Sequence, residues 1–394
     1  MDTPPAHLPL PDLVCFSHLR WNFVYQRPQH LMSRFARVRR VVFVEEPEFE
    51  QTAEPHLRVS SPRDGLEVVV PVLDESVGAR EAITMQRALL TEHIARSCVA
   101  APTFWFQTPM ALPVAPTELA GVVIYDCMDE LSAFDQAPPS LIFNEKQLLA
   151  RADLVFTGGR ALYEAKRGKH PSVHCFPSAI DDAHFAGARV HAHGARCQPE
   201  IAQLPPGARI GFCGVIDERL DVELLGGLAA LRPQYQFVMV GPTVKIDPGL
   251  LPRRSNIHYL GMRDYADLPV LMAEWDAAMM PFARNDATRY ISPTKTPEYL
   301  AAGLPVVSTS IRDVVRQYGD PGLVAIADEA EGFAAAIDAA LLTRNDPSRL
   351  RAVDAALQQI SWETTWERMA ALERSVARGT AAVESARVEH ADAR

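Results

Sequence analysis

A cation and a carboxylate one helical turn apart mark the stretch of this sequence that is best suited to bind an anion. Lys295 and Glu298 fall in the first turn of a short predicted helix. Ser292 or Thr294 caps this helix, and Gly303 ends it in the left-handed conformation. The unpaired N–H groups of such a helix start attract anions, and the Lys295 ammonium group suits phosphate. Glu298 can accept hydrogen bonds from two adjacent hydroxyl groups, as on a ribose. A diphosphate flanked by sugars fits this pattern, whereas the plainer interpretation is an amphipathic helix with a surface lysine.

The same stretch predicts further phosphate contacts and a strand behind the helix. Thr294 and Thr296 offer hydroxyl and N–H groups to phosphate oxygens. Pro297 is tolerated in the first turn of a helix, because the N–H that it lacks has no partner there. Residues 304–307 are apolar and predict a buried strand directly after the helix.

Acidic residues follow two predicted strands in the first half of the chain. The strand at residues 41–44 ends at Glu45 and Glu46, and the strand at 122–125 is followed by three carboxylates within residues 126–130. Side chains at the carboxyl ends of parallel strands point into the crevice where ligands bind. We therefore expect these carboxylates to lie near a ligand.

Strands alternate with helices twice along the chain, which predicts an α/β protein with two doubly wound parallel sheets. A chain of 394 residues is also too long for one ordinary core. The first half has predicted strands at residues 13–17, 41–44, 57–60, 66–70, 103–106, 122–125 and 153–157. The second half has them at residues 208–214, 237–240, 257–260, 277–281 and 323–326.

The predicted organisation divides the chain into two domains and three shorter parts. The N-terminal domain spans residues 1–185, a linker with two adjacent prolines spans 186–206, and the C-terminal domain spans 207–360. A last helix at about 361–378 carries two tryptophans and is expected to pack back on the N-terminal domain. Residues 379–394 predict a flexible tail.

Composition and charge narrow the classes of function. The chain has 39 Lys+Arg against 49 Asp+Glu, and its formal charge of −10 argues against nucleic acid as the main partner. A local basic pocket or a weak membrane contact stays compatible with this charge. The six cysteines are scattered, with no CxxC and no metal-ligand spacing, which is typical of reduced thiols in a cytoplasmic protein. The start of the chain has no signal-peptide pattern, and no apolar run is long enough to predict a membrane span.

Two Rossmann-like halves, a linker, the element E-Y-L-A-A-G-x-P-V-V at residues 298–307 and a final helix with tryptophans together resemble a GT-B glycosyltransferase. Within that fold the chain is similar to bacterial polysaccharide and cell-envelope enzymes of the family 1/4 type. The resemblance implies that the C-terminal half holds a nucleotide-sugar donor and the N-terminal half holds the acceptor, with an interdomain cleft between them. It also implies that the segment with Lys295 meets the diphosphate and that Gly261 and Met262 lie where the nucleobase is read.

One departure from the family pattern bears on the mechanism. The large retaining group of GT-B enzymes has two glutamates separated by seven residues; Glu298 matches the second, but the first falls on Tyr290 in the donor site. An inverting mechanism is the alternative, in which a group of the acceptor half deprotonates the attacking hydroxyl. Asp129 lies where similar inverting enzymes carry a catalytic Asp and is the first candidate base, and His18 is the second. The plainer alternatives are that Asp129 caps a turn and that His18 orients a loop.

Other residues complete the predicted site. Arg219, on the loop that begins at Gly214, offers the diphosphate a second cation, unless it simply pairs with Asp217 or Asp221. The residues expected to position the acceptor are Gln26, Arg27, Glu45 and Asp126. Because cations and a helix start neutralise the leaving diphosphate, no metal and no cofactor is expected.

The leading hypothesis is a cytoplasmic glycosyltransferase that uses a UDP-linked sugar to extend a glycan or a lipid-linked acceptor, with peripheral association at the inner face of the membrane as an option. A small-molecule acceptor is also compatible with the fold. Two alternatives stay open at this point. One is a GT-B-like UDP-sugar epimerase, and the other is a non-catalytic GT-B module that binds a nucleotide.

Overall fold

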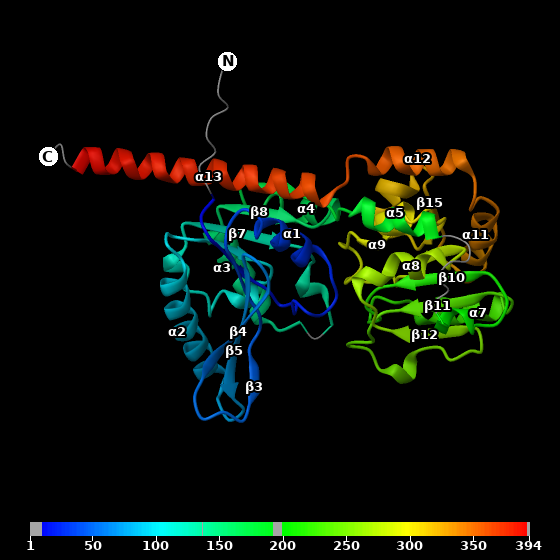
Figure 1. Ribbon diagram of the computed structural model, residues 1–394, viewed down its shortest axis with the longest axis horizontal. Helices are drawn as coiled ribbons and strands as arrows, with labels where there is room; N and C mark the ends of the chain where they lie inside the picture. Colours follow the sequence, from blue (N-terminus) through cyan, green and yellow to red (C-terminus); the bar gives the residue numbers. More distant parts are fainter. Residues whose placement is uncertain (1–9, 136, 192–198, 392–394) are drawn as a thin grey trace, which may run out of the picture.

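The computed structural model describes residues 10–135, 137–191 and 199–391. It contains two α/β domains that lie side by side along the long axis of the molecule (Figure 1), as the alternation of strands and helices predicts. The N-terminal domain has strands β1 (Leu13–Phe16), β2 (Val41–Val44), β3 (Glu48–Glu50), β4 (His56–Arg63), β5 (Leu66–Asp74), β6 (Thr103–Phe106), β7 (Val122–Cys127), β8 (Leu154–Thr157) and β9 (Val173–Cys175). The C-terminal domain has strands β10 (Arg209–Cys213), β11 (Gln236–Val240), β12 (Ile257–Gly261), β13 (Ala277–Met280), β14 (Val306–Ser308) and β15 (Val324–Ile326).

Both sheets are doubly wound. The N-terminal sheet has the order β3-β5-β2-β1-β6-β7-β8-β9, in which every pair is parallel, and β4 joins β5 antiparallel. The C-terminal sheet has the order β12-β11-β10-β13-β14-β15 and is parallel throughout. The central strands are short apolar runs that are buried on both faces, as expected for parallel sheets covered by helices. The strand order reverses between β1 and β6 and between β10 and β13, so a ligand crevice is expected at the carboxyl ends of these strands.

Helices cover both faces of each sheet. The N-terminal domain has α1 (Arg27–Phe35), α2 (Ala79–Ser97), α3 (Ser140–Arg151) and α4 (Arg160–Lys166). The helices that follow are α5 (Asp182–His191), α6 (Pro199–Ala202), α7 (Val222–Leu231), α8 (Leu268–Ala273), α9 (Lys295–Ala301), α10 (Arg312–Val314), α11 (Ala330–Leu342), α12 (Pro347–Leu357) and α13 (Trp362–Ala391). In the described part of the chain, no helix combines the length and the apolar character that crossing a bilayer requires.

The segment between the domains differs from the predicted linker at 186–206. Its first part is α5, whose residues Phe185 and Ala188 are buried in the core of the C-terminal domain together with Ile180. Part of the predicted linker, residues 192–198, lies outside the described residues, and α6 follows it. The C-terminal domain therefore begins before residue 186, because α5 packs against α8 and α9 of that domain.

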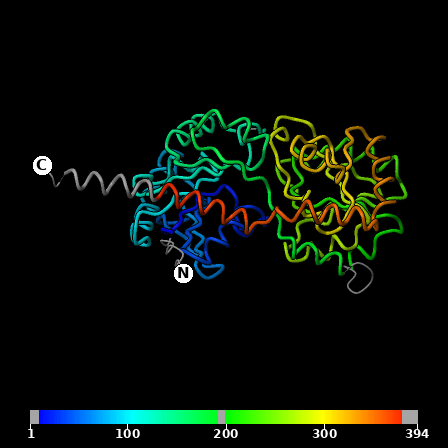
Figure 2. The backbone as a smooth tube through the Cα atoms, turned by 90° about the horizontal axis from the view of Figure 1, so that it is seen from above, coloured from blue at the N-terminus to red at the C-terminus, as the bar shows by residue number. Residues whose placement is uncertain are grey.

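The last helix returns to the N-terminal domain. Figure 2 shows α13 leaving the C-terminal domain and running across the N-terminal domain. Trp362 and Met369 are buried there against α1 and the sheet. The Arg39 guanidinium group donates two hydrogen bonds to Glu373, at 2.5 and 2.8 Å, and both side chains are buried. Helix α13 continues to Ala391, so the stretch predicted as a flexible tail, residues 379–394, is helical up to that residue, and residues 392–394 lie outside the described part.

Candidate active site

Two adjoining cavities lie between the domains, at the carboxyl ends of their central strands. The first has a volume of about 140 Å³ and the second of about 380 Å³. They share five wall residues, which are Val24 and Tyr25 of the N-terminal domain and Cys213, Gly214 and Lys295 of the C-terminal domain. Both domains thus contribute to both cavities, and the predicted donor residues Gly214 and Lys295 lie on the shared wall.

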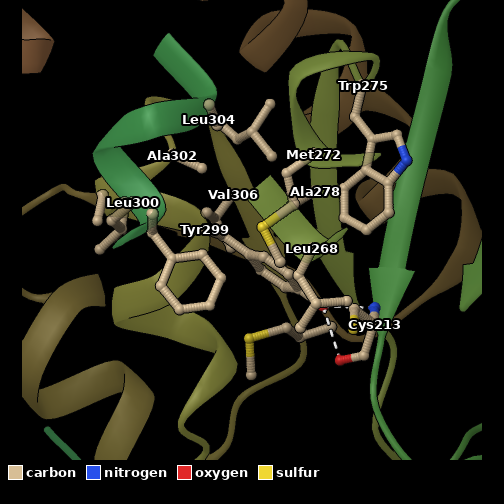
Figure 3. Close-up of a cluster of buried hydrophobic side chains, with 14 of the residues drawn as sticks. Cys213, Leu268, Met272, Trp275, Ala278, Tyr299, Leu300, Ala302, Leu304 and Val306 are labelled. Atoms are coloured by element: carbon tan, nitrogen blue, oxygen red, sulfur yellow. Dashed lines mark hydrogen bonds between the residues drawn. The ribbon is translucent and has the colours of Figure 1, made fainter. Parts of the chain in front are cut away.

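Helix α9 is fixed at this wall by the hydroxyl group of Tyr299. This hydroxyl accepts a hydrogen bond from the Cys213 N–H (2.6 Å) and donates one to the Cys213 carbonyl group (3.1 Å), as Figure 3 shows. The ring packs against Trp275 in the core of the C-terminal domain. Trp275 in turn needs Gly211 on β10, because a Cβ atom there would lie 1.9 Å from the indole ring. The core therefore sets the position of the first turn of α9.

Lys295 forms an ion pair with Glu298 one turn later. Both side chains are largely buried, at 13% and 4% exposed. Burial lowers the pKa of Lys295, because it disfavours the charged ammonium group. The negative charge of Glu298 and its hydrogen bond act in the opposite direction, and the pKa of Lys295 lies above its usual value. Burial also raises the pKa of Glu298, although Lys295 opposes this rise. The carboxylate is thus occupied by Lys295 and hidden from the cavities, which contradicts the predicted ribose contact of Glu298.

The start and the end of α9 differ from the prediction in part. Thr294 lies at the N-cap position but its side chain makes no capping hydrogen bond there, and its backbone is helical. Ser292 lies two residues before the N-cap, and its carbonyl group accepts a hydrogen bond from Ser178 of the other domain (2.6 Å), so neither predicted cap acts as one. Gly303 ends the helix at φ +82°, as predicted. The Leu304 N–H donates to the Tyr299 carbonyl group (3.0 Å) and so belongs to the turn that follows the helix. The strand predicted at 304–307 therefore begins two residues later, as β14 (Val306–Ser308).

The two threonines predicted to bind phosphate differ in their surroundings. Thr294 lines the first cavity. Thr296 is fully buried, and its hydroxyl group contacts the Met280 sulfur atom at 3.1 Å. The predicted phosphate contact of the Thr296 side chain is therefore wrong.

Asp129 and Arg219 meet in the first cavity from opposite domains. Burial raises the pKa of Asp129, the Arg219 guanidinium group opposes this rise, and Asp217 adds to it. Arg219 donates to both carboxylate oxygens of Asp217, with its Nε at 2.9 Å from Oδ1 and its Nη2 at 2.6 Å from Oδ2. Its guanidinium group also lies over the ring of Phe134, 5.6 Å from the centroid. Of the predicted alternatives for Arg219, pairing with Asp217 is confirmed, whereas Asp221 instead caps α7.

His18 does not line either of the two cavities. Burial lowers its pKa to about 4, and the positive charge of Lys245 adds to the shift. The Nδ1 atom is buried without a hydrogen-bond partner among the described residues. His18 is therefore neutral near pH 7 but only weakly basic, which makes Asp129 the better placed of the two candidate bases.

Residues 207–343 match the family model described as Glycosyl transferases group 1. This part of the chain is thus similar to group 1 glycosyltransferases. A curated relative, the putative teichuronic acid biosynthesis glycosyltransferase TuaH of Bacillus subtilis (strain 168), is 26% identical over 205 residues, which are 48% of this chain and 50% of the relative. The match therefore spans about half the length of that relative.

Solved structures with the same arrangement of domains support this fold. The sucrose-phosphate synthase of Thermosynechococcus elongatus aligns over 94% of this chain and 100% of its own, with a TM-score of 0.68 and 16% identity. An α,α-trehalose 6-phosphate synthase of Burkholderia multivorans aligns over 95% and 98%, with a TM-score of 0.66 and 14% identity. An E. coli trehalose-6-phosphate protein bound with UDP-2-fluoro glucose aligns over 92% and 99%, with a TM-score of 0.67 and 14% identity. At these identities the likeness establishes the GT-B fold, which confirms the predicted fold class.

In the N-terminal domain, two of the residues predicted to bind the acceptor form a buried ion pair. Arg27 donates to both carboxylate oxygens of Asp126, at 3.1 and 2.7 Å, and to the Phe176 carbonyl group. Asp126 is fully buried and also accepts a hydrogen bond from the Trp105 indole. The predicted acceptor contact of Asp126 is therefore wrong. Arg27 lines the first cavity, but its charge is already neutralised.

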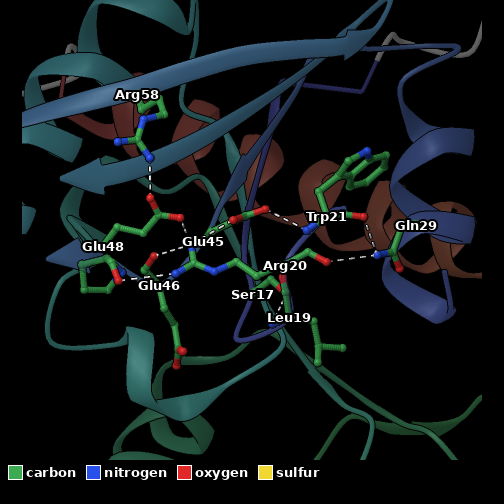
Figure 4. Close-up of polar contacts among 10 residues, drawn as sticks. Ser17, Leu19, Arg20, Trp21, Gln29, Glu45, Glu46, Glu48 and Arg58 are labelled. Carbon is green, nitrogen blue, oxygen red and sulfur yellow. Dashed lines mark hydrogen bonds and ion pairs between the residues drawn. The ribbon is translucent and has the colours of Figure 1, made fainter. Parts of the chain in front are cut away.

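Glu45 holds the loop between β1 and α1 and does not reach the cavities. Its carboxylate accepts hydrogen bonds from the Trp21 N–H (2.7 Å) and the Arg20 guanidinium group (2.9 Å), as Figure 4 shows. Gln29 donates to the carbonyl groups of Arg20 and Trp21 from the other side. Both carboxylate oxygens of Glu45 are thus engaged within the loop, and its acceptor role stays a prediction without a cavity contact. Gln26, at the end of this loop, does line the first cavity.

The remaining predicted donor residues are divided between the second cavity and the domain interface. Met262 lines the second cavity. Gly261 turns the chain at φ +69° and accepts the Gly241 N–H at 2.9 Å, but it is not part of the cavity wall. Tyr290 packs against the apolar cluster of the N-terminal domain and is not among the wall residues of either cavity, so its place in the donor site stays a prediction.

Sequence reasoning missed the aromatic residues that connect the domains at the second cavity. Tyr25 and Tyr265 come from different domains, and their rings lie 4.6 Å apart. His184 stacks on Tyr265 at 4.4 Å, and its Nε2 lies 2.9 Å from the Tyr265 carbonyl oxygen. The Tyr265 hydroxyl group is buried without a hydrogen-bond partner among the described residues. Nothing in the sequence relates Tyr25 to Tyr265, because the contact depends on how the domains meet.

A second missed feature is a polar contact that holds the domains together. Asp313 of the C-terminal domain accepts a hydrogen bond from the Ala161 N–H at the start of α4 (2.9 Å). Arg312 and Arg316 form ion pairs with Glu164 of α4, at 2.9 and 3.0 Å. The relative position of Asp129 and Lys295 therefore depends on this interface as well as on each core.

Proposed function

We propose that this chain transfers a sugar from a UDP-linked donor to a hydroxyl group of a glycan or lipid-linked acceptor. One observation carries the proposal: Asp129 of the N-terminal domain and Lys295 of the group 1 glycosyltransferase domain line the same cavity. A carboxylate with a raised pKa suits a general base, and a lysine on the opposite wall suits a leaving diphosphate.

The sizes of the cavities suggest how the donor lies. The first cavity, of about 140 Å³, is smaller than the 300–1,000 Å³ that is usual for small-molecule sites, whereas the second, of about 380 Å³, falls within that range. We place the nucleoside in the second cavity beside Met262, and the diphosphate at the shared wall of Gly214 and Lys295. The sugar then extends into the first cavity toward Asp129.

The chemistry follows from this placement. Asp129 accepts the proton of the acceptor hydroxyl, whose oxygen attacks the anomeric carbon while the bond to the diphosphate breaks. The nucleoside diphosphate leaves with the electron pair, and Lys295 stabilises the developing charge. This reaction inverts the anomeric centre and requires no metal ion or cofactor. Within the described residues there is no cluster of three or more His, Cys, Asp or Glu arranged to hold a metal.

The nature of the donor and the acceptor is argued from the relatives. A UDP-sugar is favoured because an E. coli relative in fold is described with UDP-2-fluoro glucose and a Burkholderia relative as UDP-forming. A cell-envelope polysaccharide is favoured as product because the curated relative is described as a teichuronic acid biosynthesis glycosyltransferase. We therefore propose a cytoplasmic enzyme that acts at the inner face of the bacterial membrane.

Two measurements test the proposal. A thermal-shift comparison of UDP, GDP and ADP should show the largest stabilisation with UDP. Asp129→Asn should abolish release of UDP from the sugar donor in the presence of acceptor while calorimetry still finds near wild-type UDP affinity, because the base lies outside the diphosphate site. Retained turnover of Asp129→Asn would rule out this base. Conversion of a UDP-sugar without any acceptor, followed by NMR, would instead identify an epimerase, and nucleotide binding without turnover would identify a non-catalytic module.

A further inference from the structure

The exposed face of α3 carries two large apolar side chains that no described residue covers. Ile142 and Phe143, in the first turn of this helix, are 65% and 64% exposed. Lys146 follows three to four residues later and therefore lies on the same face of the helix. Neighbouring exposed apolar residues of this size are uncommon on a protein surface unless the surface binds something.

Two lysines that form no ion pair with any described residue lie beside this apolar pair. Lys146 and Lys169 line one shallow groove together with Ile142. The loop with Lys169 follows α4 and is tied to the end of α3 through His170, whose Nε2 lies 2.9 Å from the Ala152 carbonyl oxygen. Two further exposed arginines lie close by in the chain, Arg151 at the end of α3 and Arg167 two residues before Lys169, although neither lines the groove. None of these four cations forms an ion pair with a residue in the described part of the chain.

The acidic residues at this surface are already engaged. Glu145 also lines the groove, but its carboxylate points inward and accepts hydrogen bonds from the buried Lys166 ammonium group (2.6 Å) and the Tyr125 hydroxyl (2.9 Å). Asp153, just after α3, accepts the Val123 N–H (2.8 Å). The surface is therefore locally positive on a chain whose formal charge is −10.

This surface lies close to the mouth of the interdomain cleft. Phe134, six residues before the start of α3, lies under the Arg219 guanidinium group of the other domain. The Asp135 N–H donates to Glu218, also of the other domain (3.0 Å). The first turn of α3 thus lies a few residues along the chain from Phe134, which contacts Arg219 in the wall of the first cavity.

We propose that the face of α3 with Ile142 and Phe143, together with Lys146 and Lys169, docks on an anionic lipid surface. Cations next to exposed apolar side chains match the two layers of such a surface, since the cations meet phosphate headgroups and the apolar side chains enter the acyl boundary. The inference rests on the proposed function only for the benefit of docking, which would bring a lipid-linked acceptor to the cleft. Binding itself requires no catalysis.

Vesicle sedimentation of the full chain tests the proposal. Vesicles of phosphatidylcholine with phosphatidylglycerol should bind the protein, and vesicles of phosphatidylcholine alone should bind it far more weakly. Each lysine or arginine near an anionic surface contributes about fivefold in affinity, so the double variant Lys146→Gln/Lys169→Gln should bind about 25-fold more weakly. The double variant Ile142→Ser/Phe143→Ser should lose tenfold or more.

Matched controls on the C-terminal domain make the result specific. Leu342→Ser removes an apolar side chain that is 89% exposed, and Arg351→Gln removes an exposed cation, so both should bind vesicles like the wild type. Equal binding to neutral vesicles, unchanged binding of the α3 variants, or equal losses in the controls would overturn the proposal. Calorimetry with UDP on the same samples reports folding and the donor site separately, so a failure of the membrane inference is distinguishable from a failure of the proposed function.

Discussion

Replacement of Lys295 by methionine should reduce both stability and nucleotide affinity, and the two effects are separable. Lys295 and Glu298 form a largely buried ion pair, at 13% and 4% exposed. An exposed pair would contribute at most about 1 kcal/mol, but removal of one partner of a buried pair leaves a charge without compensation and costs about 3–5 kcal/mol. We therefore expect Lys295→Met to lower the free energy of unfolding by about 3 kcal/mol near pH 7.

The pH dependence of this loss has a defined sign. Burial already raises the pKa of Glu298, and removal of Lys295 raises it further because Lys295 opposes the shift. A group with a raised pKa in the folded state favours folding at pH below its ordinary pKa and disfavours it as pH rises through the folded value. The deficit of Lys295→Met in urea unfolding should therefore be small near pH 4 and grow toward pH 7.

A double variant separates stability from binding. Lys295→Met/Glu298→Gln has no buried charge and should recover most of the stability, yet it should bind UDP as weakly as the single variant. The loss of a charge-assisted hydrogen bond is about 1.5–3 kcal/mol, or roughly 10- to 150-fold in affinity by calorimetry. Lys169→Met, at an exposed lysine outside both cavities, is the control. Wild-type UDP affinity in the double variant would refute the assignment of Lys295 to the diphosphate.

Three further predictions address the first cavity, the buried threonine and the interface. Arg219→Gln should move the acid limb of the kcat/KM profile to higher pH, because Arg219 opposes the raised pKa of Asp129; Asp217→Asn should move it to lower pH, and an unshifted limb would exclude Asp129 as the titrating base. Thr296→Val should leave UDP affinity unchanged by calorimetry, since its hydroxyl group contacts only the Met280 sulfur atom; a tenfold loss would contradict this placement. Asp313→Ala should lower the free energy of unfolding by about 1–2 kcal/mol, because it leaves the first turn of α4 without its acceptor, whereas Asp313→Asn should retain most of the stability.

The sequence predicts the sheets well because their strands are distinctive. Runs such as residues 41–44 and 103–106 are short, β-branched or aromatic and fully buried, which distinguishes them from the amphipathic helices between them. Segments without that contrast were missed or misassigned. The short strand β3 alternates two glutamates around one phenylalanine at the sheet edge, and α5 lies in a stretch whose histidines and glycines resemble a linker.

The site could be located from the sequence but its hydrogen bonds could not. The cavities lie at the carboxyl ends of predicted strands, as the topology requires. Arg27 and Asp126, however, are 99 positions apart, and only the folded sheet brings them together. Lys295 and Glu298 are the exception, because their spacing of three on a helix is itself a signal for an ion pair. The prediction of a diphosphate at Lys295 and a ribose at Glu298 did not take this ion pair into account.

The ion pair of Lys295 implies that donor binding is coupled to proton uptake. A diphosphate at the shared wall competes with Glu298 for the ammonium group, and Glu298 is too buried to gain water in exchange. Burial raises the pKa of Glu298, and the Lys295 ammonium group, which opposes this rise, is shared with the diphosphate once UDP is bound. Glu298 should therefore take up a proton as UDP binds, and the uptake should be larger at pH 6 than at pH 8. Calorimetry of UDP binding in buffers with different ionisation enthalpies measures this uptake. The phosphate of UDP releases protons in the same range, so the difference between the wild type and Glu298→Gln is the relevant quantity. If the two proteins exchange the same number of protons, Lys295 keeps Glu298 as its partner in the complex, and the diphosphate must be neutralised by other groups.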